Sequence, residues 1–258
     1  MALRRILAAA AISSLAAGGA LACDYPGPPP DAGEARADTG DILWAAFSDA
    51  TQRYDHAILG DGIEAGGLRA ATADKDGCEL SVILPDTRVF EDLAPRIADL
   101  DGDGRNEIVV VETDVARGAS LAIYGLRSGR LEKLAATPPI GQTHRWLAPL
   151  GAADLDGDGI LEIAYVDRPH LAKILRVWRY VNGRLTEVAA ASGLTSHRIG
   201  DAFIQGGFAS CGGRAVILTA DADWRRVMAT RLEGGKLVAT DLGPYSGPDS
   251  LDPSIACR

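Results

Sequence analysis

Short apolar segments with alternating polar positions recur along the chain, and glycine, asparagine or aspartate turns bound them. Two of these segments, Leu121–Tyr124 and Leu175–Trp178, precede the turn dipeptides Ser128-Gly129 and Asn182-Gly183. Apolar alternation on both sides of a two-residue glycine turn predicts a β-hairpin. Because no segment has the period of a long amphipathic helix, the pattern predicts an all-β chain.

The glycine turns recur at a nearly constant spacing. Four turns begin at Asp76, Ser128, Asn182 and Gly234, which are 52, 54 and 52 residues apart. A repeat of this length with about four strands is typical of a β-propeller blade, a twisted sheet that cannot bury both faces alone. We therefore predict a β-propeller of about four four-stranded blades. The expected blades are residues 42–86, 87–140, 141–193 and 194–245.

Two acidic loops follow the same repeat. The stretch Asp99-Leu-Asp-Gly-Asp-Gly-Arg-Asn-Glu107 returns 55 residues later as Asp154-Leu-Asp-Gly-Asp-Gly-Ile-Leu-Glu162. Alternate carboxylates on a tightly curled loop can converge on Ca²⁺, a hard cation that takes about six to eight oxygen ligands. Glycines permit the curl, so that a main-chain carbonyl can complete the shell. We expect two calcium ions. One is held by the side chains of Asp99, Asp101, Asp103 and Glu107 and the main-chain carbonyl of Arg105, and the other by the side chains of Asp154, Asp156, Asp158 and Glu162 and the main-chain carbonyl of Ile160.

The segments after the loops argue against an EF-hand. An EF-hand needs a glutamate at the twelfth loop position and then a helix, whereas this chain has Val110 and Tyr165 there. Ile108–Val111 and Ile163–Val166 are rich in β-branched and aromatic residues and predict buried strands. Calcium is therefore expected to fix the loops rather than to open a pair of helices. The alternative is two solvated Asp-Gly turns that bind no metal.

These loops and their period resemble the FG-GAP or VCBS-type repeat proteins, whose blades are similar to those of the integrin α-chain propeller. The resemblance covers about residues 54–245 and is carried by the D-x-D-G-D-G-x-x-E loops. It implies a calcium-binding β-propeller in which the loop aspartates and the closing glutamates are the ligands. The resemblance does not by itself supply an activity or a partner.

The first 22 residues have the three parts of a secretory leader. Arg4 and Arg5 form the basic start, Ile6–Leu21 is the apolar core, and Ala20-Leu21-Ala22 is a cleavage site. We predict cleavage after Ala22 and a periplasmic or secreted bacterial protein, with lipidation at Cys23 as the alternative. The apolar core of the leader is too short to span a membrane as a stable helix, and no other apolar run approaches about 20 residues. The proline-rich residues 23–41 predict a disordered linker before a propeller at 42–258.

The four cysteines predict disulfide bonds. An even number of cysteines in an oxidising compartment favours two bridges, and the sequence leaves their pairing open among Cys23, Cys78, Cys211 and Cys257. In the fourth repeat, Gly207, Ala209 and Cys211 stand where the third has Asp154, Asp156 and Asp158. A disulfide at Cys211 could therefore lock the fourth blade in place of a metal.

Charge and motifs restrict the function. The net charge of −9 argues against a nucleic-acid partner, and the chain has no nucleophile elbow, no H-E-x-x-H motif and no phosphate-binding loop. The four histidines are scattered in sequence; His144 and His197 fall at equivalent repeat positions, which favours a packing role. We expect a non-catalytic propeller that presents its loops to a protein or glycan. The alternative is an exported polysaccharide hydrolase or lyase with its site at the central channel.

Overall fold

The computed structural model describes residues 27–257, so the predicted leader, its cleavage site and Cys23 lie outside the described residues. Nearly all regular elements are strands, which confirms the all-β prediction. The strands are β1 (Glu34–Arg36), β2 (Trp44–Thr51), β3 (Glu64–Ala71), β4 (Leu80–Ile83), β5 (Arg88–Phe90), β6 (Arg96–Ala98), β7 (Glu107–Asp114), β8 (Gly118–Arg127), β9 (Arg130–Ala136), β10 (Leu147–Ala153), β11 (Glu162–Asp167), β12 (Ile174–Val181), β13 (Arg184–Ser192), β14 (Leu194–Thr195), β15 (Gly207–Cys211), β16 (Arg214–Asp221), β17 (Arg226–Glu233) and β18 (Lys236–Pro244). A 3-10 turn η1 (Pro248–Leu251) and a short helix α1 (Pro253–Ala256) follow them. No helix in residues 27–257 has the length and apolar character needed to cross a membrane.

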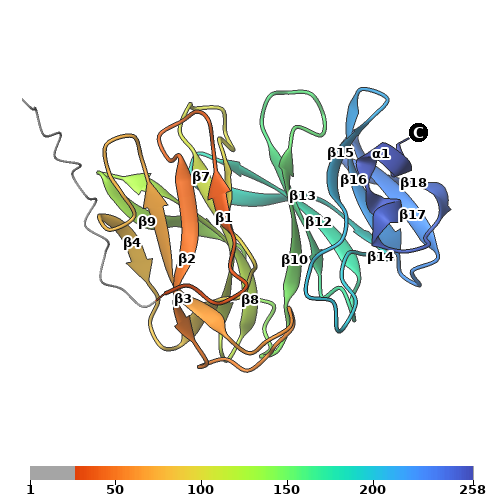
Figure 1. Cartoon of the computed structure of the whole chain (residues 1–258). Helices are drawn as coiled ribbons and strands as arrows, with labels where there is room; N and C mark the ends of the chain where they lie inside the picture. The colour runs from red at the N-terminus through yellow and green to blue at the C-terminus, as the bar shows by residue number, and fades with distance from the viewer. Residues whose placement is uncertain (1–26, 258) are drawn as a thin grey trace, which may run out of the picture.

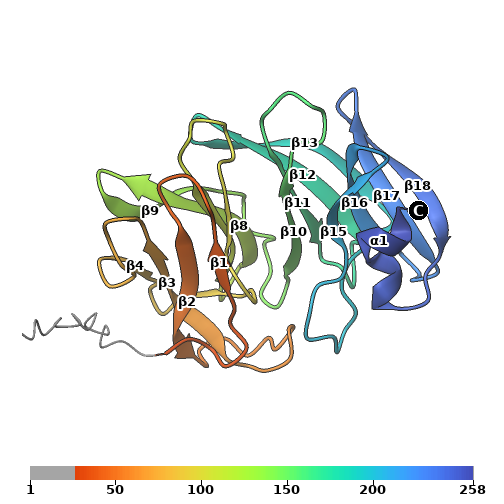
Figure 2. The ribbon, with the colours of Figure 1, turned by 45° about the horizontal axis from the view of Figure 1, so that its top comes forward.

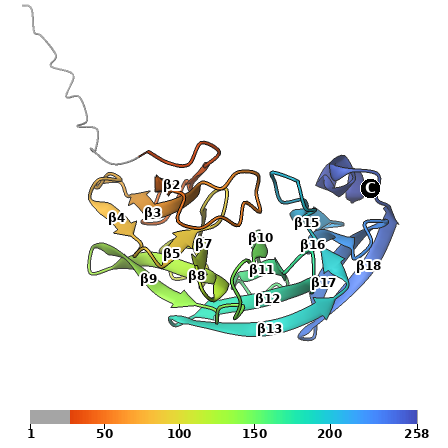
Figure 3. The same ribbon diagram turned by 90° about the horizontal axis from the view of Figure 1, so that it is seen from below.

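The described strands form three antiparallel sheets. The first has the order β1-β2-β3-β5-β7-β8-β9, with β4 also on β3 and β6 also on β7; the second is β10-β11-β12-β13; the third is β14-β16-β17-β18, with β15 also on β16. The sheets stand side by side in an arc (Figures 1 and 3), and in the second sheet β10 lies on the inner side of the arc and β13 on the outer side. This is a propeller-like arrangement of sheets.

The blade count remains a prediction because hydrogen bonds join the first two repeats into one sheet. The link runs through β5, which pairs with β3 at Ala65 and Phe90 and with β7 on its other side. The four predicted blade ranges therefore do not correspond one to one with the three hydrogen-bonded sheets.

Three of the four predicted glycine turns are two-residue hairpins. Ser128 and Gly129 join β8 to β9 with φ of 53° and 75°, and Asn182 and Gly183 join β12 to β13 with the same two values. Gly234 and Gly235 join β17 to β18 with φ of 57° and 75°. Positive φ at both positions is the conformation that matches the twist of paired strands, which explains why asparagine and glycine occur there.

The fourth of these turns, Asp76-Gly77, is not a two-residue hairpin. It lies in the longer connection between β3 and β4, and Gly77 is not among the glycines with positive φ. A Cβ at this position would come within 2.9 Å of the ring of Trp44. Gly77 is therefore required by the close approach of an indole ring, which sequence spacing could not reveal.

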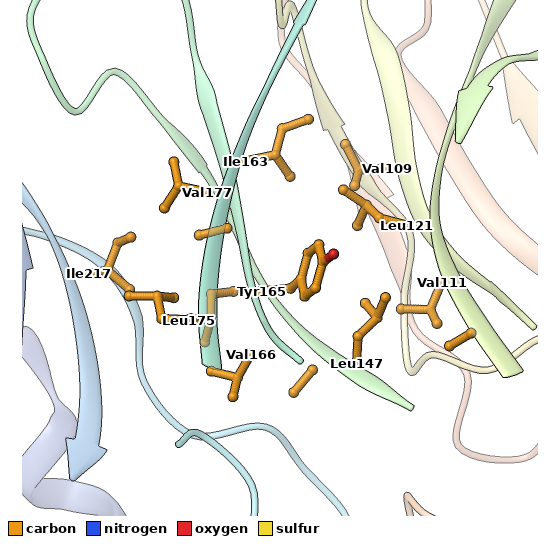
Figure 4. Close-up of a cluster of buried hydrophobic side chains, with 14 of the residues drawn as sticks. Val109, Val111, Leu121, Leu147, Ile163, Tyr165, Val166, Leu175, Val177 and Ile217 are labelled. Atoms are coloured by element: carbon orange, nitrogen blue, oxygen red, sulfur yellow. The ribbon is translucent and has the colours of Figure 1, made fainter. Parts of the chain in front are cut away.

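The largest core cluster lies between the sheets. Figure 4 shows Val109, Val111 and Leu121 of the first sheet facing Leu147 and Tyr165 of the second. On the far side of the second sheet, Leu175 and Val177 lie toward Ile217 of the third sheet. Except for Tyr165, which is 5% exposed, these side chains are at most 2% exposed. Each sheet thus buries apolar surface against its neighbour.

The N-terminal segment differs from the disordered linker predicted for residues 23–41. Within it, β1 pairs with β2 through Ala35 and Ala45, and the amide of Gly33 donates to the carbonyl of Leu93 at 2.7 Å. The side-chain amide of Asn106 donates to the carbonyl of Ile42 at 2.8 Å. The segment has no core of its own, but the free edge of β2 supplies its backbone partners. Within residues 27–41, β1 therefore extends the first sheet.

A disulfide bond holds the C-terminal segment against the third sheet. Cys211 at the end of β15 is bonded to Cys257, just after α1, and Leu251 in η1 is buried against Val216 and Leu218. Figure 2 shows α1 beside β15 at the end of the arc. Cys78 is disulfide-bonded as well, and no cysteine among the described residues is free.

We predict that replacing Cys211 and Cys257 together by serine lowers the stability of the protein. The bridge closes a loop between positions 46 residues apart, and the chain-entropy model assigns such a loop about 4 kcal/mol of stabilisation. Urea unfolding followed by tryptophan fluorescence would measure the loss. A midpoint equal to that of the unsubstituted protein would show that the bridge does not stabilise the third sheet.

Candidate metal sites

The two acidic loops occupy equivalent places in the fold. The first joins β6 to β7 and the second joins β10 to β11. Glycines at the third and fifth positions after the first aspartate have positive φ in both loops, between 74° and 90°. The carboxylate of Asp99 accepts hydrogen bonds from the amides of Asp103 and Gly104 at 3.1 and 2.9 Å. Asp154 likewise accepts from Gly157 and Gly159 at 2.7 and 2.9 Å.

The closing glutamate of each loop turns back toward the aspartates. Glu107 accepts a hydrogen bond from the amide of Leu100 at 3.0 Å, and Glu162 accepts one from Leu155 at 2.8 Å. These bonds hold each glutamate under its loop, at the first residue of a buried strand. Carboxylate oxygens then lie within 4.8 Å of one another in two groups, Asp99, Asp101 and Glu107, and Asp154, Asp156 and Glu162. Either group could hold a metal ion.

The other two predicted aspartate ligands, Asp103 and Asp158, accept hydrogen bonds from groups of the protein. Asp103 accepts from the guanidinium of Arg105 at 2.9 Å and from the amide of the same residue at 2.9 Å. Asp158 accepts from the amide of Ile160 at 2.9 Å. Neither Asp103 nor Asp158 belongs to the converging groups among the described residues. The part assigned to the carbonyls of Arg105 and Ile160 stays a prediction.

The three converging carboxylates of the first loop have no ion-pair partner in the described part of the chain, although Arg105 pairs with Asp103 in the same loop. Within residues 27–257, no Lys, Arg or His forms an ion pair with Asp99, Asp101 or Glu107. The Oδ1 atom of Asp101 is buried and has no hydrogen-bond partner. Burial, and then repulsion by Asp101, Asp103 and Asp99, raises the pKa of Glu107 to about 7. An orphaned buried oxygen beside further carboxylates fits a hard cation bound by oxygen ligands.

In the second loop, by contrast, the side chain of Arg179 on β12 reaches the carboxylates. Its guanidinium donates to Asp156 at 3.0 Å and to Asp158 at 2.8 Å. It also donates through Nε to Glu162 at 2.8 Å, and a second, very short contact joins Nη2 to the same carboxylate oxygen. Burial raises the pKa of Glu162, and the bonded Arg179 opposes that shift. Sequence reasoning missed Arg179, because it lies on the strand after the loop.

The fourth repeat has no corresponding acidic loop. Gly207, Ala209 and Cys211, predicted to replace the aspartates, are part of β15, which pairs with β16 across Gly212 and Gly213. A strand and a tight turn thus take the place of the loop. The two groups described above are the clusters within residues 27–257 that could hold a metal ion.

A second candidate region gathers the four histidines, which are far apart in sequence. A small pocket is lined by His56, His144, Trp146 and His170, among others. His197 is fully buried; its ring lies 5.2 Å from the ring of Trp146, and its Nδ1 is 2.8 Å from Nε2 of His170. These residues come from four connections between strands. The pocket is thus formed by connections from different parts of the chain.

Buried acids lie beside this pocket. Nδ1 of His56 is 2.5 Å from the carboxylate of Glu91, which is fully buried and also accepts from Thr113 at 2.6 Å. Glu64 on β3 is 8% exposed; burial, followed by repulsion from Glu91, raises its pKa to about 9. Burial, with His197 and His56 next, lowers the pKa of His170 to about 4. The pocket therefore has a histidine oriented by a buried carboxylate.

Comparison with known proteins supports the repeat assignment. Residues 97–165, which include both acidic loops, match the family model of the FG-GAP-like repeat. The chain therefore contains an FG-GAP-like repeat. No curated protein matches the sequence.

Among solved structures, the crystal structure of the exotype rhamnogalacturonan lyase YesX matches with a TM-score of 0.43 and 15% sequence identity. The match covers 84% of this chain and 51% of that one, so the chain spans about half the length of the lyase.

We predict that Glu64→Gln stabilises the protein more at about pH 8 than at about pH 5. Between its ordinary pKa of 4.5 and the raised value of about 9, Glu64 keeps its proton in the folded state and loses it in the unfolded state. The free energy of unfolding therefore falls as pH rises through this range, and glutamine removes that dependence. Thermal melts should show a Tm several degrees higher for the variant at pH 8.

The matched control is Glu233→Gln, at an exposed position at the end of β17. This control should have the pH profile of the unsubstituted protein. A Glu64→Gln variant whose Tm difference from the unsubstituted protein is the same at both pH values would contradict the raised pKa.

Proposed function

We propose that this FG-GAP-type repeat protein is an exported, calcium-binding, non-catalytic β-propeller. Bound Ca²⁺ orders its acidic loops, and the resulting rigid surface is presented to a protein or glycan partner. The observation that carries the proposal is the convergence of three carboxylates in each loop to within 4.8 Å. Neither group contains nitrogen or sulfur ligands, which favours a hard cation over zinc or copper.

The first loop gives the strongest support for a bound cation. Asp99, Asp101 and Glu107 would hold the ion, and their charge would otherwise remain uncompensated. The buried, unpartnered Oδ1 of Asp101 is a coordination position that no described protein donor uses. Once bound, a divalent cation would offset two of the three negative charges of these carboxylates and fix β6 relative to β7.

Export agrees with the covalent structure. The disulfide between Cys211 and Cys257 is typical of an oxidising, extracytoplasmic compartment. The leader predicted at residues 1–22 has the charge and apolar pattern of a secretory signal. Both observations support a periplasmic or secreted protein.

We predict that Ca²⁺ raises the Tm of the protein by roughly 5–10 °C relative to the protein in chelator, since an ion that binds only the folded state stabilises it by mass action. Asp101→Asn should abolish most of this rise. Differential scanning calorimetry in calcium, in magnesium and in chelator would measure both effects. Magnesium should act weakly, because it keeps its water ligands more strongly than calcium.

Asp223→Asn is the matched control for this experiment, because Asp223 is exposed and lies outside both loops. This variant should keep the full calcium response. No calcium-dependent change in Tm and no bound ion in the unsubstituted protein would mean that the loops are only acidic turns.

One observation favours catalysis as a second function. His56 is oriented by the fully buried Glu91 at the edge of a pocket that also contains His144, Trp146 and His170. A histidine whose one ring nitrogen is held by a carboxylate can offer the other nitrogen as a general base. The exported polysaccharide hydrolase or lyase considered from the sequence would use this pocket.

If the protein is such an enzyme, His56→Gln should lower the rate of polysaccharide cleavage by at least about a hundredfold, the scale of general-base catalysis. The assay follows reducing ends and newly formed C=C bonds, using neutral and acidic polysaccharides. His144→Gln is the companion variant, because His144 lines the same pocket but pairs with the exposed Asp55 rather than with a buried acid. Absence of turnover by the unsubstituted protein on every polysaccharide would favour the binding function.

A further inference from the structure

We propose that Arg179 is a built-in cation of the second acidic loop, so that the two loops differ in their need for metal. The first loop would depend on a bound divalent cation. The second would be ordered by the guanidinium of Arg179 and would bind Ca²⁺ only by displacing it. The inference rests on the proposed calcium function and changes its expected stoichiometry from two ions to one.

The contacts of Arg179 are those expected of a substitute for the metal. Its guanidinium contacts Asp156, Asp158 and Glu162 at the same time. Two of these residues, Asp156 and Glu162, belong to the group that converges to within 4.8 Å. The carboxylate of Glu162 is fully buried, and the side chain of Arg179 is 24% exposed. The positive charge is therefore held inside the loop.

The first loop has no equivalent of Arg179. In the second sheet, Ile163 is paired with Trp178 and Glu162 with Arg179. In the first sheet, Ile108 is paired with Tyr124, so the position after Tyr124 corresponds to Arg179. That position is Gly125, which has no side chain and is crowded by Leu134, 2.7 Å from where its Cβ would be. The position of the neighbouring strand that matches Arg179 therefore supplies no cation to the first loop.

This difference sets the cost of metal binding in each loop. Calcium entering the first loop meets Asp99, Asp101 and Glu107, none of which has an ion-pair partner among the described residues; Arg105 of this loop pairs with Asp103 instead. Calcium entering the second must first separate Arg179 from a buried carboxylate, and breaking a buried ion pair on one side is strongly unfavourable. Repulsion between Arg179 and a divalent ion within the same few ångströms opposes simultaneous occupancy. We therefore expect the second loop to bind calcium at least about tenfold more weakly than the first.

Calcium titration calorimetry, with the bound metal counted after equilibrium dialysis, tests this inference on the purified protein. The unsubstituted protein should bind one ion tightly. Asp101→Asn should remove that ion, whereas Asp156→Asn should leave the count at one. Arg179→Met keeps much of the side-chain bulk without the charge and should raise the count to two, while Arg179→Lys keeps the charge and should leave it at one.

The melting temperature in chelator gives a second readout. The Tm of Arg179→Met should fall in chelator and recover in calcium, because its second loop then needs the metal. If Arg179→Met does not fold, the comparison of Asp101→Asn with Asp156→Asn decides the question.

Two equal tight sites in the unsubstituted protein, or a loss of one ion with Asp156→Asn, would overturn the inference and leave calcium binding intact. Failure of both the unsubstituted protein and Arg179→Met to bind calcium would instead overturn the proposed function.

Discussion

Burial of apolar surface between neighbouring sheets is the interaction on which the rest of the structure depends. A sheet of about four strands has two apolar faces and cannot cover either of them by itself. The second sheet therefore lies between the first and the third, and Ile163, Val177 and Ile217 contribute to one continuous cluster. The arc of sheets follows from this packing. It also brings the inner strands and their connections close together, which places the candidate sites.

The two acidic loops have the same backbone conformation but differ in the charges that surround their carboxylates. Both loops have the same glycine conformations and the same hydrogen bond from a loop amide to the closing glutamate. Their charge balance differs, because β12 supplies Arg179 to the second loop whereas β8 has Gly125 at the corresponding place. A buried carboxylate stays ionised only if a cation or hydrogen-bond donors compensate its charge. The residue on the neighbouring strand determines whether that cation is an arginine side chain or would have to be a bound metal ion.

The inner side of the arc collects polar groups that have no role in the sheets themselves. His56 and His170 come from different repeats, yet both line one pocket, and Glu91, from another repeat, contacts His56. Catalytic and binding residues are often found on loops that a rigid scaffold positions. The acidic loops and this pocket are distinct sets of residues, so variants can separate a metal-dependent role from a chemical one.

The sequence by itself determined the features that depend on local interactions. Alternating apolar positions and turns such as Asn182-Gly183 specified the hairpins, because two residues with positive φ direct the chain back on itself. The spacing of Asp99, Asp101 and Glu107 likewise specified a converging acidic loop. Local spacing wrongly predicted a two-residue hairpin at Asp76-Gly77, where the glycine is instead needed because the ring of Trp44 lies close to it.

Only the tertiary structure decided the pairing of Cys211 with Cys257, the addition of β1 to the first sheet, the gathering of the four histidines and the position of Arg179. Each of these depends on which strands become neighbours and in what register. That choice is made by packing between residues far apart in the chain, and no local pattern contains it.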